Sequence, residues 1–233
     1  YSHPTFSCIV HTCGRAKARD GKVMEKSSDR GFEEFGGRVA SAWRDLRPTT
    51  RTLVERALQS ANAPATGGAN YDARSELELS RLLEALDESA REAGAQEALS
   101  AEQSIELVRV ADACAFVLHS EARSAEVFAQ LLERALRARD YARVDRVADT
   151  LSTRLAPTEI CELARNHNPA LRAIAHEALA QKPSSVLVDL LGDPVDAEVA
   201  RDALEVQADD YDSEEARWIV STLERIDEEG MDE

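Results

Sequence analysis

Aromatic residues are scarce in this sequence, at 5% of 233 residues, and β-branched residues are few as well. Strands favour both of these residue types. Ala, Leu, Arg and Glu dominate instead, and they are strong helix formers. With 43% hydrophobic and 31% charged residues, the composition is typical of a folded globular chain. The sequence therefore predicts an all-α protein.

Cysteine is also sparse. Cys8, Cys13, Cys114 and Cys161 are too few for a disulfide scaffold in a chain of this length. Cys114 and Cys161 lie within apolar helical patterns, which indicates small core residues.

Long hydrophobic runs are missing. No apolar stretch approaches the ~18 residues that a transmembrane helix needs. The beginning of the sequence also lacks the apolar stretch, about 7–15 residues long, of a secretory signal. We therefore expect no membrane association and a cytoplasmic location.

The net charge of −16 is unevenly distributed along the chain. Residues 1–59 hold 11 basic and 7 acidic residues, residues 60–181 hold 13 and 20, and residues 182–233 hold 4 and 17. Nucleic-acid binding depends on clustered Lys and Arg that neutralise phosphates. This balance argues against a nucleic-acid partner and favours either a solvated acidic face or a basic partner.

The sequence predicts four parts. Residues 1–23 lack helical periodicity and are expected to be a disordered tail, a cloning remnant, or sequence upstream of a start at Met24. Residues 24–61 contain the stripes of two short N-terminal helices. Residues 62–73 include Asn62-Ala-Pro-Ala-Thr-Gly-Gly and are predicted to be a flexible linker. Residues 74–233 are predicted to form a helical repeat domain.

Several helix starts carry capping patterns. Ser75-x-x-Glu78 and Ser100-x-x-Gln103 both match the capping box. Asn168-Pro169 combines an N-cap residue with proline at the first helical position. The helix that follows Ser100 is apolar around most of its circumference, which predicts a central position.

The C-terminal third repeats a pattern. Ile174, Ala178 and Leu179 recur as Val199, Ala203 and Leu204 at a constant shift of 25 residues. The segment Asn168-Pro-Ala-Leu-Arg-Ala-Ile-Ala-His-Glu-Ala-Leu179 resembles the second helix of a HEAT-type (armadillo-like) repeat. Residues 193–204 resemble a looser copy, in which no Arg follows the aliphatic residue, and residues 212–223 a weaker one. The resemblance covers residues 156–227 and implies an α-solenoid of stacked antiparallel helical hairpins.

No arrangement of residues in the sequence points to a reaction. His3, Cys8, His11 and Cys13 are potential zinc ligands, but their spacing is irregular for a structural site. The sequence contains no metalloprotease motif, Ser-His-Asp arrangement or phosphate-binding glycine loop. We therefore predict no catalytic residue, no bound metal and no cofactor.

Two features are candidate binding residues. Arg139, Arg143 and Arg146 fall on one side if their segment is helical, and they form either a salt-laced solvated face or a site for an anion or acidic peptide. Trp218 lies at the flank of the last apolar stripe. It either packs against the preceding repeat or stays exposed for a partner.

The sequence best fits a non-enzymatic scaffold or adaptor that binds another protein. A helical-repeat protein that interacts with nucleic acid is the first alternative, which the negative charge opposes. A metal-dependent enzyme is the second.

Overall fold

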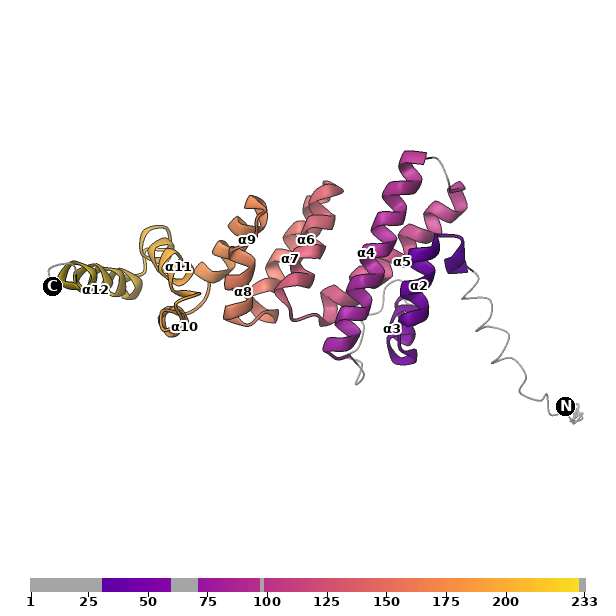
Figure 1. Ribbon diagram of the computed structural model, residues 1–233. Coiled ribbons are helices and arrows are strands. Elements are labelled where there is room, and N and C mark those ends of the chain that lie inside the picture. Colours follow the sequence, from indigo (N-terminus) through magenta and orange to yellow (C-terminus); the bar gives the residue numbers. More distant parts are fainter. Residues whose placement is uncertain (1–30, 60–70, 97–98, 231–233) are drawn as a thin grey trace, which may run out of the picture.

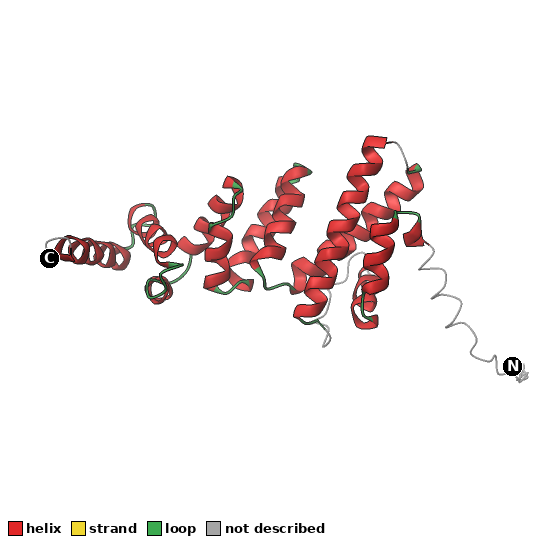
Figure 2. Cartoon of the chain, viewed as in Figure 1, coloured by secondary structure: helices red, strands yellow, loops and turns green. Residues whose placement is uncertain are grey.

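Every regular element in the described part of the chain is an α-helix (Figure 2). The computed structural model describes residues 31–59, 71–96 and 99–230. The all-α prediction is therefore confirmed, whereas the predicted tail at residues 1–23 lies outside the described residues. In chain order the helices are α2 (Gly37–Asp45), α3 (Pro48–Gln59), α4 (Ala73–Gln96), α5 (Ala101–Glu121), α6 (Ala125–Arg137), α7 (Tyr141–Arg154), α8 (Pro157–Ala164), α9 (Pro169–Ala180), α10 (Ser184–Leu190), α11 (Ala197–Asp209) and α12 (Glu214–Gly230).

Neighbouring helices pack in pairs along an elongated body. The pairs are α4 with α5, α6 with α7, α8 with α9, and α11 with α12, and α9 also contacts α7 and α11. Helices α2 and α3 lie at one end of this body and α12 at the other (Figure 1). The arrangement is compatible with a helical repeat. In the described ranges, no helix combines the length and apolar character needed to cross a membrane.

The N-terminal helices share a hydrophobic core with the helices that follow residue 70. Trp43 is buried, and its ring stacks on Phe32 with ring centroids 4.0 Å apart. Arg51 belongs to α3, and its guanidinium lies 5.6 Å from the centre of the Trp43 ring of α2. Helix α2 packs on α4, and α3 packs on α5. Helices on both sides of the predicted linker, residues 62–73, therefore contribute to one core.

A polar cluster fixes the start of α4 against the start of α3. Arg47 pairs with Asp72 and, at 3.1 Å, with Glu78, and the buried Thr50 hydroxyl donates to Glu78 at 2.6 Å. The Asp72 carboxylate caps α4 by accepting from the backbone N–H of Ser75 at 2.7 Å. The predicted capping box Ser75-x-x-Glu78 is therefore wrong. Asp72 caps α4 instead, and the Glu78 carboxylate binds Thr50 and Arg47 at the start of α3.

Carboxylates also connect successive pairs of helices. Glu76 of α4 accepts hydrogen bonds from Ser124 at the start of α6. Glu159 of α8 accepts from the backbone N–H of Ala125 at 2.6 Å. These acceptors satisfy amide groups at a helix N-terminus, where no intrahelical partner exists. Further along the chain, Arg165 donates to the buried Asp196 at 2.6 Å.

The other capping predictions are confirmed. Ser100 and Gln103 form a reciprocal capping box at the start of α5. The Asn168 side chain accepts from the backbone N–H of Ala170, and Pro169 is the first residue of α9. Helix α5 is largely buried, as predicted for a central helix, although Ile105 and Val108 are exposed.

Candidate functional site: an arginine-lined pocket between α5, α6 and α7

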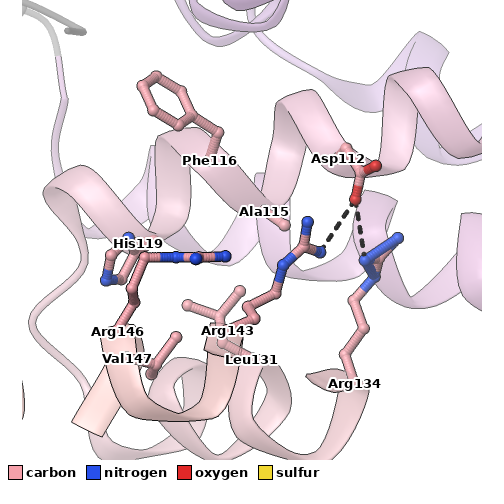
Figure 3. A pocket seen from close by; sticks show the side chains of 9 residues that line it. All are labelled: Asp112, Ala115, Phe116, His119, Leu131, Arg134, Arg143, Arg146 and Val147. Carbon is pink, nitrogen blue, oxygen red and sulfur yellow. Dashed lines mark hydrogen bonds and ion pairs between the residues drawn. The ribbon is translucent and has the colours of Figure 1, made fainter. Parts of the chain in front are cut away.

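Residues of three helices line a small, partly open pocket of about 140 Å³. Its apolar floor consists of the buried side chains Ala115, Leu131 and Val147. The polar part of its wall is formed by Asp112, His119, Arg134, Arg143 and Arg146, and Phe116 lies at its rim (Figure 3).

Helical spacing places these residues on facing surfaces. Asp112, Phe116 and His119 are separated by four and three residues, so they share one face of α5. Arg143 and Arg146 share a face of α7 by the same rule, and their side chains extend toward α5 (Figure 3). Arg134 reaches the same space from α6. The cavity thus has three guanidinium groups and one carboxylate in its wall.

Asp112 holds two of these guanidinium groups. Its Oδ1 atom accepts from Arg134 at 3.2 Å and from Arg143 at 3.0 Å. Arg134 also donates to Asp87 at 2.9 Å. Burial raises the pKa of Asp87, even though Arg134 and Arg137 act in the opposite direction. Asp112 therefore positions Arg134 and Arg143, whose remaining N–H donors stay available for a ligand.

Arg146 differs from its two neighbours. Within the described residues, its guanidinium forms no hydrogen bond or ion pair, and the residue is exposed. Arg143, by contrast, is partly neutralised by Asp112 and by Asp140, whose carboxylate lies 3.5 Å away. Arg146 is thus the cation of this pocket that has the greatest capacity for a new anionic partner.

His119 lies beside Arg146 at one end of the cavity (Figure 3). Its Nε2 atom is 3.2 Å from the Thr150 hydroxyl. Burial lowers the pKa of His119 and outweighs a hydrogen bond to the Arg146 backbone, which acts to raise the pKa; the nearby positive charges of Arg154, Arg146 and Arg143 act in the same direction as burial. These effects favour the neutral imidazole, and a negative charge placed in the pocket would favour its protonated form.

Two of the three arginines predicted from the sequence come together in this pocket. Arg143 and Arg146 line it, whereas Arg139 occupies the turn between α6 and α7 with a φ of 55° and is exposed. Arg139 therefore does not share a helical face with the other two. Arg134 and the α5 residues Asp112, Phe116 and His119 were not among the predicted binding residues.

Trp218 is remote from the pocket. It lies on α12, and 67% of its surface is exposed. Of the two predicted alternatives, packing against the preceding repeat is therefore not observed. Its exposure is compatible with a second contact surface.

No group of three or more potential metal ligands occurs in the described ranges. The set His3, Cys8, His11 and Cys13 lies outside those ranges. A scan against protein-family models finds no match for this chain, and comparisons with curated proteins and with solved structures find none either.

Proposed function

We propose that this protein is a binding module built on stacked, HEAT-like helical pairs, and that its arginine-lined pocket binds an acidic segment of a partner protein. The observation that carries the proposal is the convergence of Arg134, Arg143 and Arg146 from two helices on one partly apolar cavity. Guanidinium groups recognise carboxylates through paired N–H donors, and this recognition strengthens when the site excludes water.

The apolar surroundings favour a peptide over a free inorganic anion. Phe116 is 40% exposed at the rim of the pocket. Ile105 and Val108, which are 70% and 48% exposed, lie on the same side of α5 by helical spacing. A segment that places an acidic side chain in the pocket and apolar side chains along α5 would cover all three residues. Clusters of exposed apolar residues next to polar groups are typical of protein-binding surfaces.

The overall charge supports a protein partner over a nucleic acid. The chain carries a net charge of −16, and Asp112, Asp140 and Asp87 already neutralise much of the positive charge at the pocket. A polyanion would meet long-range repulsion outside the pocket, whereas a short segment with one or two carboxylates would meet mainly local attraction. The charge of the pocket therefore favours a ligand with one or two negative charges over a polyanion.

The test uses a labelled helical peptide that has a Glu pair at one end and Leu residues at three- and four-residue spacing over the next three turns. Fluorescence anisotropy measures its affinity for the full chain and for the variants R146E, I105D and R139E. We expect R146E to weaken binding about tenfold or more, because it removes a charge-assisted contact and adds repulsion. R139E is the matched control, since Arg139 lies outside the pocket, and its affinity should change far less.

Equal losses of affinity in R146E and R139E would show that only the net charge of the protein matters, and this would contradict binding of the peptide in the pocket. A DNA oligonucleotide of the same net charge is titrated in parallel. If it bound as tightly as the peptide and lost affinity in R146E, the nucleic-acid alternative would replace the present one.

A further inference from the structure

Helix α12 ends the stack and packs mainly on α11 (Figure 1). Ala216 is fully buried in this contact, and Ile219 and Val220 are half-buried against the core. This is the same arrangement as along the preceding helices, in which α9 is covered in turn by α11. In the described part of the chain, however, no further helix covers α12.

A second apolar row follows the free flank of α12. Trp218, Thr222 and Ile226 are spaced by four residues, so they form one ridge next to Ile219. Trp218 is 67% and Ile226 59% exposed. The hydroxyl of Thr222 donates to the Trp218 carbonyl at 2.8 Å and accepts from Arg225 at 3.2 Å, so its hydrogen bonds are made within α12. Trp218 and Ile226 are thus two large exposed side chains on one ridge, against which the apolar face of another helix could pack.

The charge around this ridge selects the occupant. Residues 182–233 contain 17 acidic and 4 basic residues, and Glu215 lies on the same flank as Trp218 by helical spacing. Of the basic side chains on α12, Arg217 is paired with Asp212 at 2.6 Å, whereas Arg225 donates to the Thr222 hydroxyl at 3.2 Å, so one cation borders the ridge on the side away from Glu215. A second copy of the chain would bring an equally acidic end against this one, which like-charge repulsion opposes. A helix with basic residues beside its apolar face meets attraction.

We propose that the ridge of Trp218, Thr222 and Ile226 is a docking site for a basic amphipathic helix of a partner protein, which extends the stack by one helix. The partner's apolar side chains would pack on Trp218 and Ile226 and meet the half-buried Ile219, and its Lys or Arg side chains would face the acidic flank. This site is separate from the arginine-lined pocket, and it would bind a partner of the opposite charge.

The test exploits the two tryptophans of the chain, Trp43 and Trp218. Trp43 is 2% exposed, so changes in solvent quenching of the full chain report Trp218. The probe is a synthetic helix with Leu at positions i, i+4 and i+8 and Lys on both sides of that row. A second peptide of identical composition, with scrambled order, has the same charge but no apolar face. We expect the first peptide to shift the emission to shorter wavelength and to protect Trp218 from acrylamide, and the second to do neither.

Substitutions separate apolar contact from charge. I226D should weaken the amphipathic peptide about tenfold, although it adds a negative charge, because it removes apolar area from the ridge. S221D adds the same charge three residues after Trp218, on the side of the ridge away from Ile219, and should retain affinity or bind slightly more tightly. Circular dichroism confirms that both variants keep the helical content of the parent chain.

Three outcomes would overturn the proposal. The first is equal binding of the two peptides, and the second is equal affinity of I226D and the parent chain. The third is a Trp218 that is already protected from acrylamide without peptide. Protection that depends on protein concentration would then identify a second copy as the occupant, and protection that does not would identify another segment of the same chain. None of these results bears on binding of the acidic peptide to the arginine-lined pocket.

Discussion

Glu76 accepts two hydrogen bonds from Ser124, which lies 48 residues further along the chain: one from its backbone N–H at 3.0 Å and one from its hydroxyl at 2.5 Å. Glu76 is only 9% exposed, so its carboxylate is held inside the protein by the start of α6. The contact joins the first pair of long helices to the next pair. It makes one side chain of α4 part of the N-terminal cap of α6.

Replacing Glu76 with alanine should lower the free energy of unfolding by about 1–2 kcal/mol, because the substitution leaves partly buried donors of Arg123 and Ser124 without their acceptor. Urea denaturation followed by circular dichroism measures the change. E84A is the control, since Glu84 is exposed on the same helix, and its effect should stay within about 0.5 kcal/mol. Similar losses in both variants would show that Glu76 contributes no more than an ordinary helix residue.

Acid should loosen the contact of α3 with α4. Burial raises the pKa of Glu78, but hydrogen bonds from Thr50 and Arg47 outweigh it and hold the pKa below its ordinary value of 4.5. A carboxylate of lowered pKa contributes stability above pH ~4.5, and this contribution is lost as the pH falls through the lowered pKa. Trp43 emission in a W218F background should report the loss.

T50V should shift the same acid transition to higher pH and cost about 1–3 kcal/mol, because it removes the hydroxyl that donates to Glu78. T52V is the matched control, since Thr52 is exposed on the same helix and its hydroxyl donates only to the Pro48 carbonyl. An unchanged transition in T50V would show that Glu78 does not depend on this hydrogen bond.

Binding in the arginine-lined pocket should tighten as the pH falls from 8 to 6. Burial lowers the pKa of His119 in the free protein, and a bound carboxylate would raise it, so binding is linked to proton uptake. The acidic peptide itself stays ionised over this range. H119Q should remove the pH dependence and keep the affinity that the parent chain shows at pH 8. A slope that persists in H119Q would assign the proton to another group.

Asp112 should limit how strongly the pocket attracts anions. D112N removes the charge that holds Arg134 and Arg143, and the acidic peptide should bind several-fold more tightly as a result. Stability should change by less than about 1 kcal/mol, because Asp112 is 43% exposed in these pairs. D149N removes an equal charge from an exposed position of α7 outside the pocket. If D149N tightened binding equally, the gain would come from net charge alone.

The sequence was sufficient to predict what depends on local pattern. Apolar stripes and caps such as Ser100 with Gln103 and Asn168 with Pro169 identified helices correctly, because these interactions join residues that are close in the chain. The capping box at Ser75 and Glu78 failed for a tertiary reason. Arg47, just before α3, and Thr50, within it, donate hydrogen bonds to the Glu78 carboxylate, which the pattern had assigned to the backbone of its own helix.

The pocket could be predicted only in part. Arg143 and Arg146 are three residues apart, so helical geometry alone puts them together. Arg134 and Asp112 come from other helices, and their contact depends on how α5, α6 and α7 pack, which no local pattern specifies. Arg139 was grouped with the pocket residues because its sequence separation suits a helix, but the chain turns there with a positive φ.

The link between Arg165 and Asp196 has a practical consequence for dissecting the molecule. The two residues are 31 positions apart and join the α8–α9 pair to the beginning of α11. A fragment that stops between them would lose the buried carboxylate and leave the Arg165 guanidinium without it. A boundary placed between α9 and α11 would therefore cut this bond, and one placed before Pro157 would remove Glu159 from the Ala125 amide, so shorter versions of the protein should be designed to retain α8 through α11 in full.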